Sequence, residues 1–231
     1  IAPNDSVERY TELGVEVLKG YAKLIDPWTV EITLNEGGTQ RLTARSIVIA
    51  TGARPFIPDL PGLEETGYVT SDTLWDTFAE LEETPKKLVV LGGGPIGSEL
   101  AQAFARLGSN VTQIERGERL MKKEDSEVSE FAQQALINSG VTVLTSRQAT
   151  RCEIRNGKKY IIVEPHGDHT DQQETAIEYD QLICAVGRSA RLEGYGLEAL
   201  GIETERTIST DDYLETLYPN IYAAGDVAGP Y

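Results

Sequence analysis

The feature that most constrains the fold is a glycine-rich segment between a predicted strand and a predicted helix. The pattern G-x-G-x-x-G is matched by Gly92, Gly93, Gly94, Pro95, Ile96 and Gly97. The segment follows the apolar run 88–91 and opens a helix predicted over 96–107. Glu115 stands 18 residues after Gly97, at the end of the next predicted strand. This spacing and context predict a dinucleotide-binding unit, and a glycine-rich turn without a ligand is the simpler alternative.

The residue types of the motif suit that chemistry. Gly92 permits a tight turn, Gly94 lets the backbone approach a pyrophosphate, and Gly97 allows close packing of helix and strand. Free N–H groups at the start of the helix favour the negative phosphates. The carboxylate of Glu115 can accept hydrogen bonds from ribose hydroxyls and repels a 2′-phosphate. We therefore expect NAD(H) rather than NADPH, although Arg116 beside it weakens this preference.

Charge and composition exclude several other classes of protein. The 231 residues include 21 Lys and Arg against 37 Asp and Glu, a net charge of −16, which argues against binding to nucleic acid or to an anionic membrane surface. The apolar runs 88–91 and 182–186 are far shorter than the ~18 residues of a membrane span. Only two cysteines occur, Cys152 and Cys184, which predicts a reducing compartment, the cytoplasm. Their spacing and predicted strands indicate core thiols rather than a redox pair.

Periodicity predicts an α/β chain with further strands on both sides of the glycine-rich segment. Amphipathic helices are predicted from Ser71 to before Pro85 and from Asp125 to Gly140, and Asn156-Gly157 is a strong hairpin signal. Further strands are predicted at 14–18, 28–34, 40–43, 46–50, 111–114, 141–144, 150–155, 160–164, 181–186 and 220–224.

A weak internal repeat relates the two halves of the chain. Residues 14–18, a hairpin and residues 47–54 resemble residues 140–144, a hairpin and residues 182–188. Only the second copy is preceded by a strand–loop–helix–strand unit, at 87–115. The repeat predicts that a matching unit precedes Ile1 in a longer protein, and we expect the chain to be a fragment. Chance similarity between strand–turn–strand stretches is the alternative.

Several weaker signals remain open on the residues alone. Glu99, on the first turns of the predicted helix, is either a solvated charge that compensates the helix dipole or a residue facing a cofactor. The pair Gly225-Asp226 and the run Thr51, Gly52 and Ala53 follow predicted strands, but each pattern is also that of an ordinary turn. His166 and His169 lie in a polar loop without a nearby cysteine, so we predict no metal site. No hydrolase or Walker motif is present, and we predict no catalytic residue.

Four motifs in their order resemble the flavin-dependent pyridine nucleotide–disulfide oxidoreductases, the family of dihydrolipoamide dehydrogenase, glutathione reductase and mercuric reductase. The segment 124–129 and the helix after it are most similar to the mercuric reductase-like branch. The four motifs are Ile49–Pro55, Gly92–Glu99, Ala185–Arg188 and Tyr222–Asp226.

The resemblance implies a Rossmann-like FAD/NAD(P)-binding fold with a parallel sheet and a β-meander, inserted between parts of an incomplete second such domain. Residues 70–203 would form the NAD-binding domain. Residues 1–69 and 204–231 would belong to an FAD-binding domain that is incomplete here. The family's first glycine motif, its redox pair C-x-x-x-x-C and its C-terminal interface domain are absent from this sequence.

The resemblance also implies roles for individual residues. Asp226, beside Gly225, would bind the ribityl chain of FAD, and Gly52 would lie against the flavin nucleotide. Glu99 would approach the flavin and the nicotinamide. On the NAD side, Glu115 would bind the adenosine ribose and Gln148 would lie near the adenine. The residues bordering the nicotinamide would be Ala185, Val186 and Gly187.

Together these features predict the NAD-binding portion of an oxidoreductase. The full-length protein would pass hydride from NADH to FAD and electrons onward to a disulfide, a metal ion or another acceptor. We expect it to be a homodimer that binds FAD, and we expect this chain alone to be inactive and to self-associate. The alternatives are a flavoenzyme without a cysteine pair, of the transhydrogenase or NADH oxidase type, and a non-catalytic nucleotide-binding sensor module.

Overall fold

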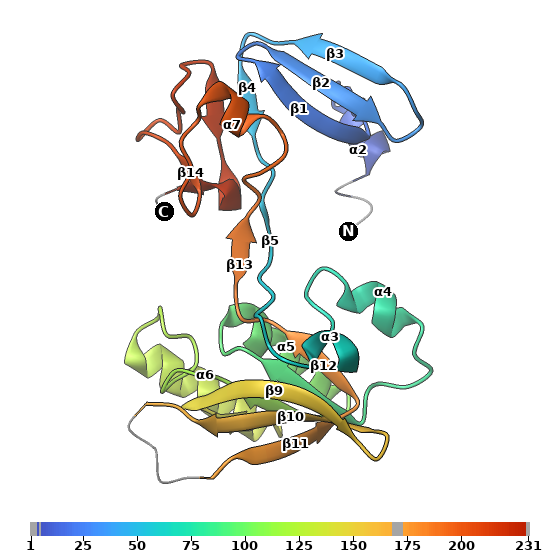
Figure 1. Ribbon diagram of the computed structural model, residues 1–231, viewed down its shortest axis with the longest axis vertical. Coiled ribbons are helices and arrows are strands. Elements are labelled where there is room, and N and C mark those ends of the chain that lie inside the picture. The colour runs from blue at the N-terminus through green and yellow to red at the C-terminus, as the bar shows by residue number, and fades with distance from the viewer. Residues whose placement is uncertain (1–3, 5, 168–172, 230–231) are drawn as a thin grey trace. The chain divides into compact units, whose positions relative to one another are not determined.

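The computed structural model describes residue 4, residues 6–167 and residues 173–229. The chain forms two compact units. One unit comprises residues 1–53 and 190–231, and the other comprises residues 54–189. Figure 1 labels many of their helices and strands. Within the described residues, no helix has the length and apolar character needed to cross a membrane.

A four-stranded parallel sheet forms the centre of the 54–189 unit. Its order is β12-β6-β7-β8. Helix α5 (Pro95–Arg106) connects β6 to β7, and helix α6 (Ser126–Asn138) connects β7 to β8. The strands are β6 (Lys87–Leu91), β7 (Asn110–Ile114), β8 (Thr142–Leu144) and β12 (Gln181–Cys184). The predicted strand–loop–helix–strand unit is thus confirmed to within one residue at most boundaries.

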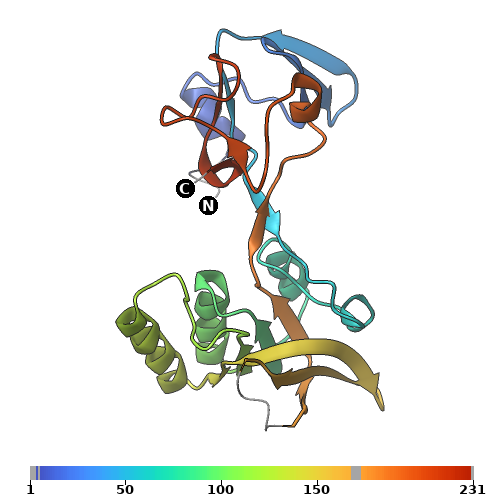
Figure 2. The same cartoon turned by 60° about the vertical axis from the view of Figure 1, so that its left-hand side comes forward.

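An antiparallel meander covers the other face of this sheet, opposite the two helices (Figures 1 and 2). It consists of β9 (Arg147–Arg155), β10 (Lys158–Pro165) and β11 (Thr175–Tyr179). Alternate side chains of β6 point to opposite faces. Leu88 and Val90 therefore pack in the core on the helix side, whereas Val89 and Leu91 pack in the core on the meander side. The hairpin predicted at Asn156-Gly157 is confirmed, with φ of 51° and 76° as a type I′ turn requires.

The remaining elements of the 54–189 unit are short. Helix α3 (Leu63–Thr66) and helix α4 (Leu74–Ala79) precede the sheet, and α4 begins after Thr73 rather than Ser71. The hydroxyl of Thr73 accepts a hydrogen bond from the Thr70 N–H at 3.0 Å, which stabilises the turn ahead of the helix. Strands β5 (Ala53–Pro55) and β13 (Arg188–Ala190) pair where the chain passes between the units.

The other unit repeats the order of a meander followed by a parallel strand. Strands β1 (Gly20–Asp26), β2 (Thr29–Leu34) and β3 (Thr39–Thr43) form the meander. Strand β4 (Ile47–Ile49) then pairs in parallel with β15 (Ile221–Ala223). This parallel in architecture matches the hairpin and the parallel strand of the predicted internal repeat, but not its strand at 14–18. The smaller elements are α2 (Val7–Glu12), α7 (Leu197–Leu200), β14 (Ile208–Ser209), η1 (Gly225–Val227) and β16 (Ala228–Gly229).

The strand predicted at 14–18 is wrong. Helix α2 ends just before these residues, and Gly14 adopts a left-handed φ of 82°. The Gly14 N–H donates to the Thr11 carbonyl and the Val15 N–H donates to the Tyr10 carbonyl, as at a helix end closed by glycine. These local hydrogen bonds replace those of a sheet, and β1 begins only at Gly20.

The compact units divide at 53/54 and 189/190, whereas the predicted domains divide at 69/70 and 203/204. The segment 54–69 packs with the glycine motif's unit, because the Pro61 carbonyl accepts the Cys152 N–H at 2.7 Å. Residues 190–203 pack with the other unit, where the Tyr195 carbonyl accepts the Leu24 N–H at 2.9 Å. Which cofactor each unit binds stays a prediction.

An ion-pair cluster between the meander and β6 predicts acid-sensitive stability. The Glu178 carboxylate accepts hydrogen bonds from Lys87 at 2.8 Å and Lys158 at 3.2 Å, which lower the pKa of Glu178 from 4.5 to about 2. Because the folded pKa lies below the unfolded one, this stabilisation is fully present above about pH 4.5 and is lost as the pH falls towards about 2. We expect Glu178→Gln to lower the urea midpoint at neutral pH, by an amount that shrinks in acid. The control variant is Glu36→Gln, because Glu36 is exposed in a turn. A loss of stability in Glu178→Gln that does not change with pH would contradict the expectation.

Candidate functional site

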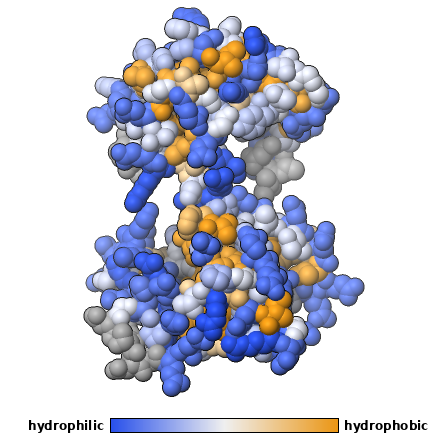
Figure 3. Space-filling model, viewed as in Figure 1, coloured by the Kyte–Doolittle hydropathy of each residue, from blue (hydrophilic) through white to orange (hydrophobic). Residues whose placement is uncertain are grey.

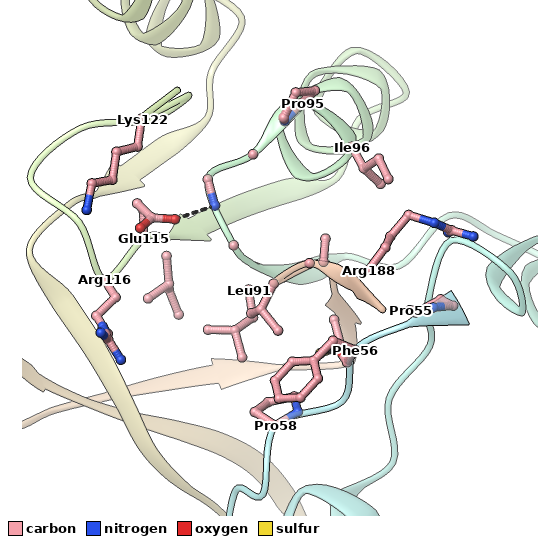
Figure 4. Close-up of a pocket in the computed structure, with 18 of the residues that line it drawn as sticks. Pro55, Phe56, Pro58, Leu91, Pro95, Ile96, Glu115, Arg116, Lys122 and Arg188 are labelled. Atoms are coloured by element: carbon pink, nitrogen blue, oxygen red, sulfur yellow. Dashed lines mark hydrogen bonds between the residues drawn. The ribbon is translucent and has the colours of Figure 1, made fainter. Parts of the chain in front are cut away.

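A pocket of about 700 Å³ lies in the 54–189 unit, at the carboxyl ends of the parallel strands. Open α/β sheets bind ligands at this edge. The glycine loop, the ends of β7 and β12 and the segment after β5 all line it. Figure 4 shows Glu115, Arg116 and Lys122 on one side, and Ile96, Arg188 and Pro55 on the other.

Two glycines of the motif are required by packing. Gly92 has a φ of 117°, and a Cβ there would collide with the carbonyl oxygen of Ala185. A Cβ on Gly97 would collide with the carbonyl oxygen of Gly92. The tight turn at Gly92 and the close approach at Gly97 are therefore features of the folded chain, as the sequence predicts.

Gly94 differs from these two glycines. Apart from Gly94 and its two chain neighbours, no atom of the described residues lies within 4 Å of the position that a Cβ on Gly94 would occupy. Gly94 lines the pocket and is the N-cap of α5, and no described side chain caps this helix end. The helix start carries partial positive charge and unpaired N–H groups, which suits it to an anion such as a phosphate.

Glu115 holds the glycine loop in place. One carboxylate oxygen, Oε2, accepts the Gly93 N–H at 2.7 Å (Figure 4), and the other, Oε1, accepts the Gly117 N–H at 2.6 Å. The Gly93 carbonyl accepts the Met121 N–H at 2.7 Å. Both the N–H and the carbonyl of Gly93 are thus hydrogen-bonded. Each oxygen of Glu115 has a further lone pair, so it can still accept a hydrogen bond from a ligand hydroxyl.

Gln113 is a supporting residue that the sequence analysis missed. Its side chain is fully buried on β7, and Nε2 donates to the Gly92 carbonyl at 3.0 Å and to the Ser98 hydroxyl at 3.2 Å. It therefore ties the glycine loop to the first turns of α5. The long polar amide within the short predicted strand 111–114 was the available signal, since a buried amide requires partners.

The proline-rich segment after β5 is a second feature that the sequence analysis missed. In the structure, Pro55, Phe56, Pro58 and Leu60 all line the pocket. The Phe56 N–H donates to the Gly187 carbonyl at 3.0 Å, which fixes the segment against the end of β12.

Basic side chains surround the Glu115 end of the pocket. Arg116, Lys122, Lys123 and Arg147 all line it. They favour an anionic ligand in a chain whose net charge is −16. Arg116 was predicted as a site residue, and the other three were not.

The structure brings most of the predicted NAD-side residues to one pocket. Gly97 packs behind the loop, and Glu99 is exposed on α5 and is not among the described residues that line the pocket. The roles of Gly97 and Glu99 stay predictions. The predicted NAD-side residues that line the pocket are Gly92, Gly93, Gly94, Pro95, Ile96, Glu115, Arg116, Gln148, Ala185, Val186 and Gly187.

The predicted FAD-side residues lie in the other unit. Because β4 and β15 pair in parallel, the residues that follow them come to the same sheet edge. These are Thr51, Gly52 and Ala53 after β4, and Gly225 and Asp226 after β15. The Thr51 hydroxyl lies 3.2 Å from the Tyr195 hydroxyl, and the Gly52 carbonyl accepts the Arg191 N–H at 3.0 Å. Their roles also stay predictions.

The two cysteines behave as buried structural thiols. Both cysteines are free and buried, and burial raises the pKa of Cys184 to about 11, which disfavours the reactive thiolate. His166 is half-buried in the described part of its loop, and His169 lies outside the described residues. No group of metal-binding side chains occurs among the residues that the structure describes.

Known proteins resemble the chain over almost its whole length. Residues 3–231 match the model of the family described as pyridine nucleotide-disulphide oxidoreductase. A mercuric reductase of Staphylococcus aureus is 38% identical over 98% of the chain. A dihydrolipoyl dehydrogenase of Rhizobium etli is 34% identical over 94% of it. The copper(II) complex of an HOCl-induced flavoprotein disulfide reductase of Escherichia coli superposes over 90% of it, with a TM-score of 0.74 and 30% identity.

These relatives are longer proteins. The chain spans 39% of the mercuric reductase, 46% of the dihydrolipoyl dehydrogenase and 45% of the solved disulfide reductase. The similarity therefore covers less than half of each relative.

Proposed function

Because the chain belongs to the pyridine nucleotide-disulphide oxidoreductase family, we propose that its 54–189 unit binds NAD(H) within a longer flavoprotein oxidoreductase. The observation that carries this proposal is the glycine loop. Its Gly93 peptide is held by Glu115 and Met121, while Gly94 faces open space at the uncapped start of α5, within the part of the chain that the structure describes. This arrangement fits a pyrophosphate that binds against the helix start.

The pocket extends to both sides of the glycine loop, as a dinucleotide requires. Glu115 follows β7 and would accept the hydroxyls of the adenosine ribose, with Gln148 near the adenine. Ala185, Val186 and Gly187 follow β12 and would border the nicotinamide. When bound, NADH supplies a hydride, and the protein contributes binding and orientation.

We infer a preference for NADH over NADPH. The Glu115 carboxylate would repel a 2′-phosphate. The competing observation is the set of basic residues at the same end, Arg116, Lys122, Lys123 and Arg147, any of which could pair with that phosphate. The preference therefore rests on Glu115 facing the ribose, and a direct comparison of the two nucleotides tests it.

The other unit would contribute to an FAD site. Its Thr51–Ala53 and Gly225–Asp226 motifs meet at one sheet edge, and Asp226 would bind the ribityl chain of the flavin. Electrons would pass to a disulfide, a metal ion or another acceptor. Because both cysteines of this chain are free and buried, a redox-active disulfide would have to come from elsewhere in the full-length protein. Free thiols also support a cytoplasmic location.

Binding and turnover test the proposal together. We expect the chain to change the fluorescence of NADH on titration, to leave the fluorescence of FAD unchanged, and to cause no loss of NADH absorbance over time. NADH oxidation by the chain without an added flavoprotein would contradict the expected inactivity. A failure to bind NADH would favour a structural or sensor role for this unit.

We expect the chain to self-associate, whereas the full-length protein would be a homodimer. Parallel strands are normally covered on both faces, yet Val48 on β4 is 61% exposed. Tyr21, Trp28 and Leu217 of the same unit are also more than half exposed, and Figure 3 shows apolar areas among the hydrophilic surface. Light scattering should give an average mass that rises with concentration, and a constant monomer mass would contradict this expectation. The variant Val48→Lys should reduce the effect.

A further inference from the structure

The wall of the pocket beyond the glycine loop includes an aromatic ring that the proposed function does not yet use. Phe56 lines the pocket, and the residue is 49% exposed. Figure 4 shows its ring beside Pro58, within the group of side chains that surround the pocket. Ligand pockets commonly place apolar and aromatic side chains against the flat parts of a ligand. An aromatic ring kept half exposed inside a pocket is available for such a contact.

Backbone contacts place Phe56 at one particular end of the pocket. Its N–H donates to the Gly187 carbonyl at 3.0 Å, and the Cys184 thiol lies 3.9 Å from its carbonyl oxygen. Both partners belong to β12 or the residues directly after it. The segment then crosses the unit, and the Pro61 carbonyl accepts the Cys152 N–H of β9. Phe56 is therefore anchored at the β12 end of the wall.

The order of the strands assigns the parts of a dinucleotide to the parts of the pocket. In the sheet, β6 lies between β12 and β7. Glu115 follows β7 and the glycine loop follows β6. With the adenosine ribose at Glu115 and the pyrophosphate at the glycine loop, the nicotinamide half falls at the end of β12, where Phe56 is anchored.

We propose that the ring of Phe56 is a contact surface for the nicotinamide half of the bound dinucleotide. The inference rests on the proposed function, because it assumes that the pocket binds NADH. A phenyl ring has an apolar face that packs against the flat nicotinamide, and the hydrogen bond to Gly187 holds its backbone in place. Neighbouring Arg188 at this end pairs with Asp72 at 3.2 Å.

The test compares two ligands that differ by the nicotinamide ring. NADH and ADP-ribose share the adenosine diphosphate and the second ribose, and ADP-ribose lacks the nicotinamide. We expect Phe56→Ala to weaken NADH binding about tenfold, as loss of a base–aromatic contact does, and to leave the Kd for ADP-ribose within about twofold. Phe56→Leu, which keeps apolar volume, should have a smaller effect. The matched control is Phe131→Leu on α6, where the residue is 78% exposed.

Calorimetric titration of the wild type and the variants with NADH and with ADP-ribose measures the two affinities. Selective loss of NADH affinity supports the assignment, and retained ADP-ribose binding shows that the variant is folded. Equal weakening of both ligands would overturn it by placing the ring at the shared part of the nucleotide. Unchanged affinity for both would overturn it outright. If the wild-type chain binds ADP-ribose and not NADH, or neither, the proposed function fails, and this inference fails with it.

Discussion

Glu115→Ala should weaken NADH binding by roughly 10- to 150-fold, the equivalent of losing one hydrogen bond to a charged acceptor at about 1.5–3 kcal/mol. In the proposed complex the carboxylate accepts from the ribose. It also accepts the Gly93 N–H at 2.7 Å and the Gly117 N–H at 2.6 Å, so its removal loosens the loop that faces the pyrophosphate. The effect therefore combines a lost contact with a less ordered site. Calorimetric titration of the variant with NADH measures it.

The neighbouring residue Glu118 provides the control. It is exposed three positions further along the same loop, so Glu118→Ala makes the same change in charge outside the pocket. We expect its NADH affinity to stay within about twofold of the wild type, since exposed charges interact weakly in salt. Glu115→Gln should also lose the repulsion of a 2′-phosphate and bind NADPH better relative to NADH. Equal NADH affinity of Glu115→Ala and Glu118→Ala would show that Glu115 is not a nucleotide ligand.

Alanine substitutions at Gly92 and Gly94 should separate folding from binding. Gly92→Ala forces a Cβ into the Ala185 carbonyl at a φ of 117°, so we expect it to destabilise the 54–189 unit by roughly 2–5 kcal/mol through overpacking and strain. Gly94 has a φ of −77° and open space around the Cβ position. Gly94→Ala should therefore leave the urea midpoint nearly unchanged while it weakens NADH binding by at least about tenfold, because the methyl group occupies ligand space.

A result that differs from the expectation has a different meaning for each of these two variants. A Gly94→Ala chain that is stable and binds NADH normally would remove the pyrophosphate from the glycine loop. A Gly92→Ala chain as stable as the wild type would mean that the turn can move away from Ala185. Urea titration and nucleotide titration of the same protein preparations provide both measurements.

The parts of the fold that follow from local sequence were predictable. The run 88–91, the glycine motif and Asn156-Gly157 encode a strand, a helix start and a hairpin through neighbouring residues alone, and the structure confirms them. The strand predicted at 14–18 failed because alternation of apolar residues does not show whether a partner strand exists. Gly14 instead closes helix α2.

The parts of the site that depend on distant contacts were not predictable. Gln113 acts through the Gly92 carbonyl, 21 residues away, and Phe56 reaches the pocket through a hydrogen bond to Gly187. Neither partner is visible in a local pattern. Glu115 was predicted as a ribose ligand from its spacing, but its hydrogen bonds to Gly93 and Gly117 emerged only from the folded loop.

Nucleotide binding is measured most simply by calorimetric titration of the 231-residue chain with NADH and, under the same conditions, with NADPH. We expect one NADH bound per chain and weaker binding of NADPH. Equal or tighter binding of NADPH would contradict the role given to the Glu115 carboxylate. If neither nucleotide binds, the 54–189 unit is not the nucleotide-binding unit proposed here.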